Sequence, residues 1–322
     1  MRQAGPALEF RPAGLDDALF WSDVYTSAQP TRAVDPLITR HDFANPGRAW
    51  IHKRFVAHDG DRAIGVGGFA HPHWETAPMR FAAVTCEILP DSRDAAHLSE
   101  MHRFLERGSR EAGAKTIRTG ANEDDPLRPQ VLVSLGYRED RRSKRWELDL
   151  VANRDRIVAM AEASRARMRE HGVVMTTLDR DGDPEVLRKL WRVSSEADQD
   201  VPTTLPSVEE PYEDFVDWLA YPGMHRDRLW LARRGDDVLG ISVLEYPPVR
   251  GMVGTAWTAT ARSARGQGIA RALKCETLMQ AMALGVERVR TGNDGANDPI
   301  LHINASMGYV QVPGRVDYLK DV

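Results

Sequence analysis

The stretch that decides the fold runs from Thr258 to Leu273 and reads TATARSARGQGIARAL. It predicts a strand, a turn of small residues and the start of a helix. The first turn of a helix leaves backbone N–H groups without partners and carries the positive end of the helix dipole. Gly266 and Gly268 would let a ligand approach this backbone closely, and Ala270 keeps the helix start slim. The turn therefore predicts a pyrophosphate site, with an ordinary turn before a core helix as the alternative.

Two segments resemble the cofactor-binding segments of the GNAT acyltransferases, which use acetyl-CoA. The family's pyrophosphate loop has the form Arg or Gln-x-x-Gly-x-Gly or Ala, and Arg265, Gly268 and Ala270 match it. Downstream, Asn297–Tyr309 resembles the family's Asn-led helix that closes on Gly-Tyr or Gly-Phe. The resemblance implies acetyl-CoA as a cosubstrate, bound by Thr258, Ala259, Thr260, Arg265, Gly266, Gln267, Gly268, Ile269, Ala270, Asn297 and Asn304.

The composition is that of a globular protein with no general attraction for nucleic acid or membranes. The chain has 322 residues, of which 42% are hydrophobic and 28% charged, and its net charge is −4. This length favours two domains. We expect a cytoplasmic protein, because no apolar run could span a bilayer and no hydrophobic signal segment follows Met1.

The sequence gives little support for a metal site or a disulfide. Cys86 and Cys275 both lie in apolar segments, and we expect them to be small core residues. His71 and His73 share a loop that contains proline, which leaves a metal there as the less favoured alternative. We therefore expect no metal cofactor.

The chain repeats itself at an offset of 172 residues. The matching segments are Gly113 with Gly285, Arg118–Gly120 with Arg290–Gly292, and Gly136-Tyr137 with Gly308-Tyr309. A second match, shifted by a small length difference, pairs Ala63–Gly65 with Val238–Gly240. These matches predict two copies of one fold.

The predicted fold class is α/β, with two tandem GNAT-like domains. Each domain is expected to have a mixed, mainly antiparallel central sheet flanked by helices. The expected boundaries are residues 1–152 for a degenerate first domain, 153–172 for a linking helix and 173–322 for an acyl-CoA-binding second domain. By resemblance, the chain is similar to the tandem group that includes the mycothiol synthase type.

The two copies differ at the glycine turn. At the same offset Arg265 falls opposite Arg93, but the small residues are replaced: Gly266 by Asp94, Gly268 by Ala96 and Ala270 by Leu98. An aspartate at this place would repel a pyrophosphate. We predict that only the second copy binds acyl-CoA through this loop and that the first is a scaffold or one wall of the substrate cleft. The alternative is a first copy that binds the cofactor through altered contacts.

The resemblance also implies direct transfer of the acyl group to an amine, without a covalent enzyme intermediate. The amine must lose a proton, the thioester oxygen needs a hydrogen-bond donor, and the thiolate benefits from a proton. By resemblance, the donor is a backbone N–H of Trp257–Thr260, where a bulge splays two strands apart.

Glu245 is the candidate catalytic base, because it ends the neighbouring strand and its counterpart in the first copy is Ala70. A solvated glutamate, a base at Asp294 or a chain of water molecules are the alternatives. Asn304 stands where the family often has a tyrosine that acts as the general acid, so the general acid of this chain is not identified.

The predicted function is acyl-CoA-dependent transfer of acetyl to a primary amine of a small molecule, with the second copy active. The alternatives are a peptide or protein N-acetyltransferase and a non-catalytic acyl-CoA sensor or scaffold. An aminoacyl-tRNA-dependent transferase is disfavoured. We expect no nucleic-acid or membrane partner and a monomer or homodimer. A cationic amine is favoured by the acidic residues Glu196, Asp198, Asp200, Glu209, Glu210 and Glu213, which would equally suit a solvated loop.

Overall fold

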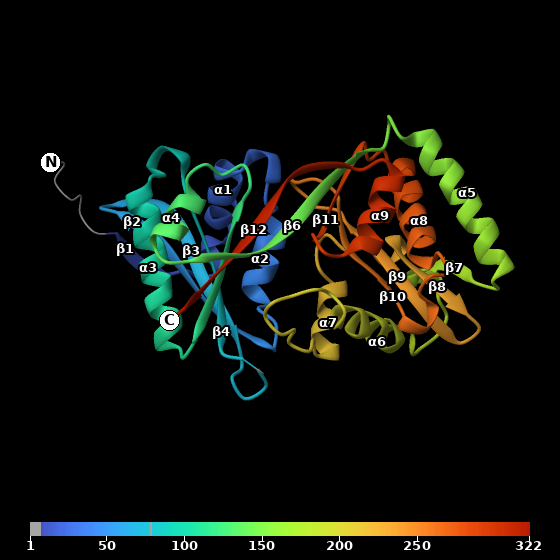
Figure 1. The fold of residues 1–322 in the computed structure, drawn as a ribbon, viewed down its shortest axis with the longest axis horizontal. Helices are drawn as coiled ribbons and strands as arrows, with labels where there is room; N and C mark the ends of the chain where they lie inside the picture. The colour runs from blue at the N-terminus through green and yellow to red at the C-terminus, as the bar shows by residue number, and fades with distance from the viewer. Residues whose placement is uncertain (1–7, 78) are drawn as a thin grey trace.

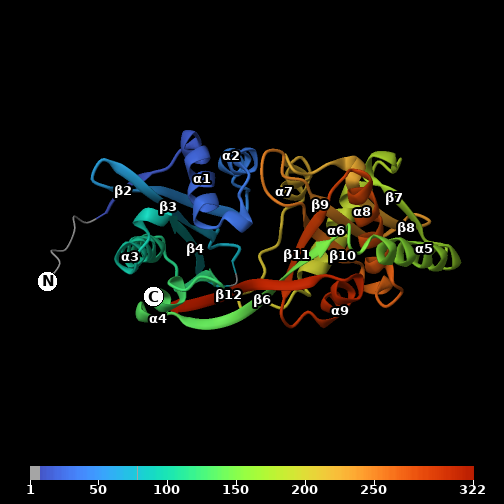
Figure 2. The same cartoon turned by 90° about the horizontal axis from the view of Figure 1, so that it is seen from above.

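The computed structural model describes residues 8–77 and 79–322 and has two lobes that lie side by side (Figure 1). The first lobe is coloured blue to green and the second mainly yellow to red. Two long strands, β6 (Arg138–Asp149) and β12 (Val310–Asp321), pass from one lobe into the other. Seen from above, they run together across the junction, and the C-terminus lies in the first lobe (Figure 2).

The elements repeat in the same order in the two halves of the chain. The helices are α1 (Ala18–Ala28), α2 (Pro36–Ala44), α3 (Ala95–Glu111) and α4 (Arg128–Ser134), then α5 (Arg154–Glu170), α6 (Val186–Asp198), α7 (Tyr212–Leu219), α8 (Ile269–Ala283) and α9 (Asp298–Met307). The other strands are β1 (Glu9–Pro12), β2 (Trp50–Asp59), β3 (Arg62–Pro72), β4 (Phe81–Ile88), β5 (Thr116–Asn122), β7 (Val174–Thr177), β8 (Leu229–Arg234), β9 (Asp237–Glu245), β10 (Gly254–Thr260) and β11 (Arg288–Asp294).

Within the described residues these strands form one 12-stranded sheet, in the order β1-β2-β3-β4-β5-β12-β6-β11-β10-β9-β8-β7. Neighbouring strands are antiparallel except at two places, where β4 pairs with β5 and β10 with β11 in parallel. The prediction of a mixed, mainly antiparallel sheet flanked by helices is confirmed.

The two halves exchange their last strands. Ser143–Asp149 of β6 pairs with β11 of the second half, whereas Arg315–Asp321 of β12 pairs with β5 of the first. The strands β6 and β12 also pair with each other. The sequence indicated two copies but not this shared sheet. The division at residues 152 and 172 stays a proposal about the repeat units.

Helices cover both faces of the sheet, and the inner strands β3 and β9 carry apolar residues on both sides. Each of these strands has one extra residue, Ile64 or Leu239, and this bulge places residues two positions apart on opposite faces. On β3, Val66 faces α1, whereas Ile64 faces α3 on the other side. On β9, Ile241 packs with the α6 side and Leu239 with α8. None of the helices in the described ranges is long and apolar enough to cross a membrane.

Candidate functional site

The parallel strands of the second half meet at one point and then diverge. Gly254 of β10 is opposite Arg290 of β11, and no further pair follows between the described residues of these strands. The pairing of β10 with β9 shifts by one residue between Thr255 and Trp257, which leaves Ala256 as the extra residue of a β-bulge. Past Gly254, the edge of β10 that faces β11 therefore has backbone groups available to a ligand.

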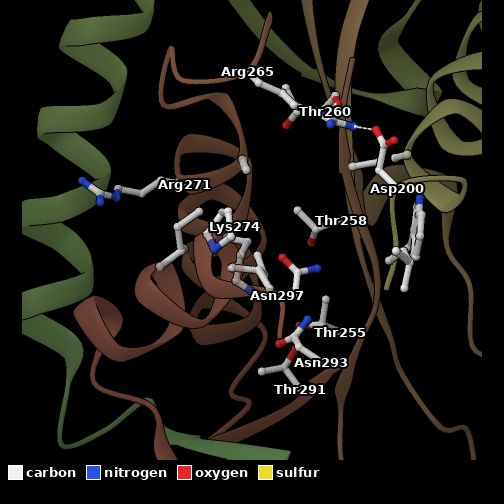
Figure 3. Close-up of a pocket in the computed structure, with 18 of the residues that line it drawn as sticks. Asp200, Thr255, Thr258, Thr260, Arg265, Arg271, Lys274, Thr291, Asn293 and Asn297 are labelled. Atoms are coloured by element: carbon white, nitrogen blue, oxygen red, sulfur yellow. Dashed lines mark hydrogen bonds and ion pairs between the residues drawn. The ribbon is translucent and has the colours of Figure 1, made fainter. Parts of the chain in front are cut away.

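A cavity of about 990 Å³ occupies the space between the diverging strands (Figure 3). Its walls come from β10, the glycine turn, the first turns of α8, the end of β11 and the start of α9. The volume is in the range of sites that hold a large ligand. Of the residues predicted to bind the cofactor, the cavity is lined by Thr258, Ala259, Thr260, Arg265, Gly266, Gly268, Ile269, Ala270 and Asn297.

The glycine turn leaves the start of α8 without a cap. Gly266 and Gly268 have φ angles of +76° and +88°, in the left-handed region that favours glycine. Gly268 is the residue before the helix, and it has no side chain to accept the first N–H groups. These donors and the positive end of the helix dipole thus point to the cavity, which suits an anionic group.

Cations surround this end of the cavity. Arg265 and Arg262 both pair with Asp200, at 2.6 and 2.7 Å, and these hydrogen bonds hold the pKa of Asp200 well below its usual range. Arg167 of α5 lies against the turn, with Nη2 3.5 Å from the carbonyl oxygen of Gly266. The guanidinium of Arg265 is therefore at the cavity but is engaged by a carboxylate, as the dashed line in Figure 3 shows.

Polar groups also line the inner part of the cavity. Thr260 Oγ1 and Trp257 Nε1 are buried and have no hydrogen-bond partner in the described part of the protein. Asn293 lines the cavity and accepts a hydrogen bond of 2.8 Å from the amide of Asn304, which is fully buried behind it. A cavity lined by polar residues of β10, β11 and the start of α9 fits a long ligand with amide and phosphate groups, such as acyl-CoA.

Three of the residues singled out in the sequence do not line the cavity. Asn304 contacts it only through Asn293. Gln267 lies in the glycine turn, but its side-chain oxygen accepts a hydrogen bond of 2.7 Å from Arg234. Glu245 is half-buried and directly opposite Gly254 in the sheet. The roles of all three stay predictions.

Two carboxylates near the cavity differ in their electrostatic surroundings. Burial raises the pKa of Glu245, and the nearby Asp42 and Asp35 raise it further. Asp294 lines the cavity but is held by Arg141 at 2.7 Å, and this hydrogen bond lowers its pKa. A base works best with a pKa near the working pH, so Glu245 is the better suited of the two.

The matching cleft of the first half is filled by a buried ionic cluster, Glu87, Arg93, Asp125 and Arg128. Arg128 lies 2.9 Å from Glu87, and Arg93 lies 3.0 Å from the same carboxylate. Arg93 and Arg128 also pair with Asp125. Glu87 and Arg128 are 1% and 4% exposed. At the 172-residue offset the cluster occupies the places of Ala259, Arg265, Asn297 and Ile300, which line the cavity of the second half.

The backbone around the first cleft also lacks the features that favour an anionic ligand in the second. The paired residues of β3 and β4 keep an unbroken register from Gly65 to Ala70, so no bulge matches the one in β10. The helix α3 is capped by Asp94, whose carboxylate accepts the N–H of His97 at 2.8 Å. The first half therefore supplies its own anion at the helix start.

Comparisons with solved structures identify the architecture. A tandem GNAT protein from the clavulanic acid biosynthesis pathway superimposes with a TM-score of 0.75 at 16% identity, over 98% of each chain. A GCN5-related N-acetyltransferase from Sphaerobacter thermophilus gives a TM-score of 0.68 at 15% identity, over 99% of this chain and 97% of that one. The fold is that of a tandem GNAT protein.

A third similar structure is the GCN5-related glucosamine N-acetyltransferase region of a fungal multi-domain β-N-acetylglucosaminidase. Its TM-score is 0.70 at 16% identity, over 98% of this chain and 38% of that longer one. No protein-family model matches the chain. No curated protein matches it in sequence.

The cavity of the second half is also lined by residues that the sequence analysis did not single out. Lys274, Thr255, Arg271 and Asn293 all line it. For Lys274 a signal was present, because the offset of 172 places it opposite His102, so both long helices carry a basic residue at this position. In the described parts of the chain, no group of three or more His, Cys, Asp or Glu side chains could hold a metal ion.

Proposed function

We propose that the chain is an acyl-CoA-dependent N-acyltransferase that transfers acetyl from acetyl-CoA to a primary amine of a small molecule, with the second half active. The proposal is carried by the contrast between the two clefts. The second has an uncapped helix start beside a cavity of about 990 Å³, whereas buried ion pairs fill the first. Because the halves share one fold, the difference points to a ligand rather than to the needs of folding.

The residues present fit acetyl-CoA. Its pyrophosphate would accept hydrogen bonds from the N–H groups around Gly268 and pair with Arg265. The free edge of β10 past Gly254 offers backbone groups for the pantetheine amides. When bound, acetyl-CoA supplies the activated acetyl group. A backbone N–H beside the bulge at Ala256 would donate to the thioester oxygen as negative charge develops there.

Glu245 is proposed as the base that takes a proton from the amine, directly or through water. Its backbone is opposite Gly254, where β10 and β11 begin to diverge. Its raised pKa brings it closer to neutral pH. The neighbouring Asp42 belongs to a second cavity of about 480 Å³ between α2 and α7, which we propose as the approach for a cationic acceptor.

The acceptor class rests on the chemistry of this face and on the similar structures. The second cavity is lined by acidic side chains and by Trp50 and Trp218. Arg48 in the same lining pairs with Asp214 and Asp217, which leaves Asp42 and Glu210 as the carboxyl groups for an added cation. Such a lining favours a cation with an apolar body. One similar structure is described as a glucosamine N-acetyltransferase region, and another as a protein of clavulanic acid biosynthesis. Both descriptions concern small molecules.

The first experiment is titration calorimetry with acetyl-CoA. We expect one site per chain. Gly268→Trp should abolish binding, because a side chain at a φ angle of +88° distorts the turn and fills the phosphate position. Ala96→Trp is the matched control in the first half, where the exposed position should tolerate the change. Circular dichroism shows whether both variants fold. Two equivalent sites would refute the assignment to the second half.

The second experiment tests catalysis with a panel of amines, and it measures turnover as the release of free thiol. We expect turnover with at least one small primary amine, reduced about 100-fold or more in Glu245→Gln if this carboxylate is the base. Binding of acetyl-CoA without turnover of any amine, peptide or protein would replace the transferase with a non-catalytic acyl-CoA sensor. Turnover of peptides alone would replace the small-molecule acceptor.

A further inference from the structure

Lys274 is a buried cation with no carboxylate beside it. It lies on α8, lines the cavity and is 2% exposed. Its Nζ is 5.4 Å from the centre of the Tyr309 ring. Among the described residues no carboxylate forms an ion pair with it, and the one charge interaction that raises its pKa comes from the neighbouring Cys275 thiol. A buried ammonium that is not paired within the protein favours an anion brought by a ligand.

The equivalent tyrosine of the first half also has a lysine over its ring, but that lysine comes from β12 instead of the long helix. There Lys320 lies over Tyr137, the counterpart of Tyr309, at 5.3 Å from the ring centre. Lys320 also pairs with Glu106 at 2.7 Å. In the second half Leu278 takes the place of Glu106 at the same offset. Both halves thus have a lysine on the tyrosine ring, but only the first supplies the counter-ion.

The position of Lys274 along the cavity separates it from the pyrophosphate end. An α-helix rises 1.5 Å per residue, so Lys274 is about 9 Å along the helix from Gly268. Figure 3 shows it on the α8 side of the cavity, between the end near Arg265 and the end near Thr255. The bulge at Ala256, where the thioester oxygen would be held, belongs to this inner part.

The other groups around Lys274 leave its charge uncompensated. On α8 itself, Glu276 is engaged by Arg165 of α5 at 2.6 Å. Cys275 is buried, and its pKa is raised by burial. Thr255 and Thr258 of β10 are neutral, as is Tyr309, whose pKa is raised by burial. Asp294, at the end of β11, pairs with Arg141. Burial lowers the pKa of Lys274 to about 8.

We propose that Lys274 is a catalytic residue that donates a proton to the departing CoA thiolate. This inference rests on the proposed acyltransferase function. As the amine nitrogen bonds to the acyl carbon, the C–S bond breaks, its electron pair goes to sulfur, and sulfur takes a proton from the Lys274 ammonium. The amine's proton passes to the base, and the neutral lysine regains one from solvent. The products are the amide and the free thiol. Asn304 could not supply this proton, because an amide is not an acid.

The test compares CoA with desulfo-CoA, which lacks the sulfur, by calorimetry at pH 8.5. We expect the wild type to bind CoA about 10-fold more tightly, because a charge-assisted hydrogen bond to the thiolate is formed. Lys274→Met should remove this preference and leave the affinity for desulfo-CoA unchanged. It should also lower kcat about 100-fold and abolish the decline of kcat as pH rises through about 8.

Lys320→Met is the matched control, since it removes the lysine on the equivalent ring of the first half. It should lower stability and keep the preference for CoA. If Lys274→Met retains that preference, or weakens both ligands equally, the inference is wrong while the proposed function stands. If the wild type binds neither ligand, the proposed function fails, and the inference fails with it.

Discussion

The two clefts of this protein have the same backbone elements and opposite contents. In the first half, Arg128 and Glu87 fill the space between β4 and β5 with a buried ion pair. In the second, a cavity follows the same divergence of strands between β10 and β11. The first cleft therefore satisfies its own charges, whereas the second leaves Lys274 and the backbone donors at the start of α8 without partners among the described residues. On the proposal that only the second cleft binds a ligand, the ion pairs of the first cleft stand where that ligand would otherwise lie.

The two halves also differ at the start of the helix beside each cleft. In the first half α3 begins after Asp94, an extended residue with a φ angle of −134° that caps the helix with its own carboxylate. In the second half, Gly266 and Gly268 adopt left-handed conformations and no side chain caps α8. The turns thus differ in conformation as well as in sequence. The two glycines allow a left-handed turn that the first half does not form.

The largest effect is expected from removing the buried ion pair that fills the first cleft. Arg128→Met should lower the free energy of unfolding by about 3–5 kcal/mol, because it leaves Glu87 buried with less compensation. Affinity for acetyl-CoA should not change. Urea unfolding and calorimetry measure the two quantities. Arg62→Gln, which removes an exposed pair with Asp91, is the control and should leave the free energy of unfolding almost unchanged. A weaker acetyl-CoA affinity in Arg128→Met would show that the clefts are coupled.

The basic residues at equivalent positions should give two separate pH windows, one acidic and one alkaline, and stability should rise with pH in both. Burial lowers the pKa of His102 from 6.5 to about 3 and that of Lys274 from 10.5 to about 8. Between pH 3 and 6.5 only the unfolded chain protonates His102, so the free energy of unfolding falls as pH falls, by about 1.4 kcal/mol per unit. Between pH 8 and 10.5 only the unfolded chain keeps the proton of Lys274, so stability rises with pH.

Urea unfolding across the pH range measures both windows. His102→Leu should reduce the acid slope, leaving the part that His52 and His225 contribute through their own lowered pKa values, and Lys274→Met should reduce the alkaline slope. An acid slope that is unchanged in His102→Leu would place the responsible proton on another group. The two variants change equivalent positions, so each is the control for the other.

The smallest expected effect concerns the competition for Arg265. Asp200 pairs with this guanidinium at 2.6 Å, and a phosphate would have to displace it. Asp200→Asn should therefore lower the Kd for acetyl-CoA about two- to fivefold, and less at high salt. Asp91→Asn, in an exposed pair of the first half, should change nothing. A weaker affinity in Asp200→Asn would mean that the carboxylate positions Arg265 for the ligand instead of competing with it.

Local patterns in the sequence were enough to predict the repeat, the class of the sheet and the strand, turn and helix start from Thr258 to Leu273. They could not show the exchange of β6 and β12, because the alternation along a strand is the same whichever neighbour it pairs with. Nor could they show the burial of Lys274, which reads as an ordinary helical lysine between Leu273 and Cys275. The ion pair of Glu87 and Arg128 likewise forms only when distant segments fold together.

The exchange of β6 and β12 has a consequence for how such a chain can be divided. When two equal units trade the same element, the arrangement is that of a domain-swapped dimer, here contained in one polypeptide. A fragment ending before α5 would keep β6 but lose β12, the partner of both β5 and β6. Its sheet would be interrupted at β5 and expose unpaired edges. Neither half contains all the strands of its own part of the sheet, so we expect a separately expressed half to pair with a second copy of itself to restore the missing strand.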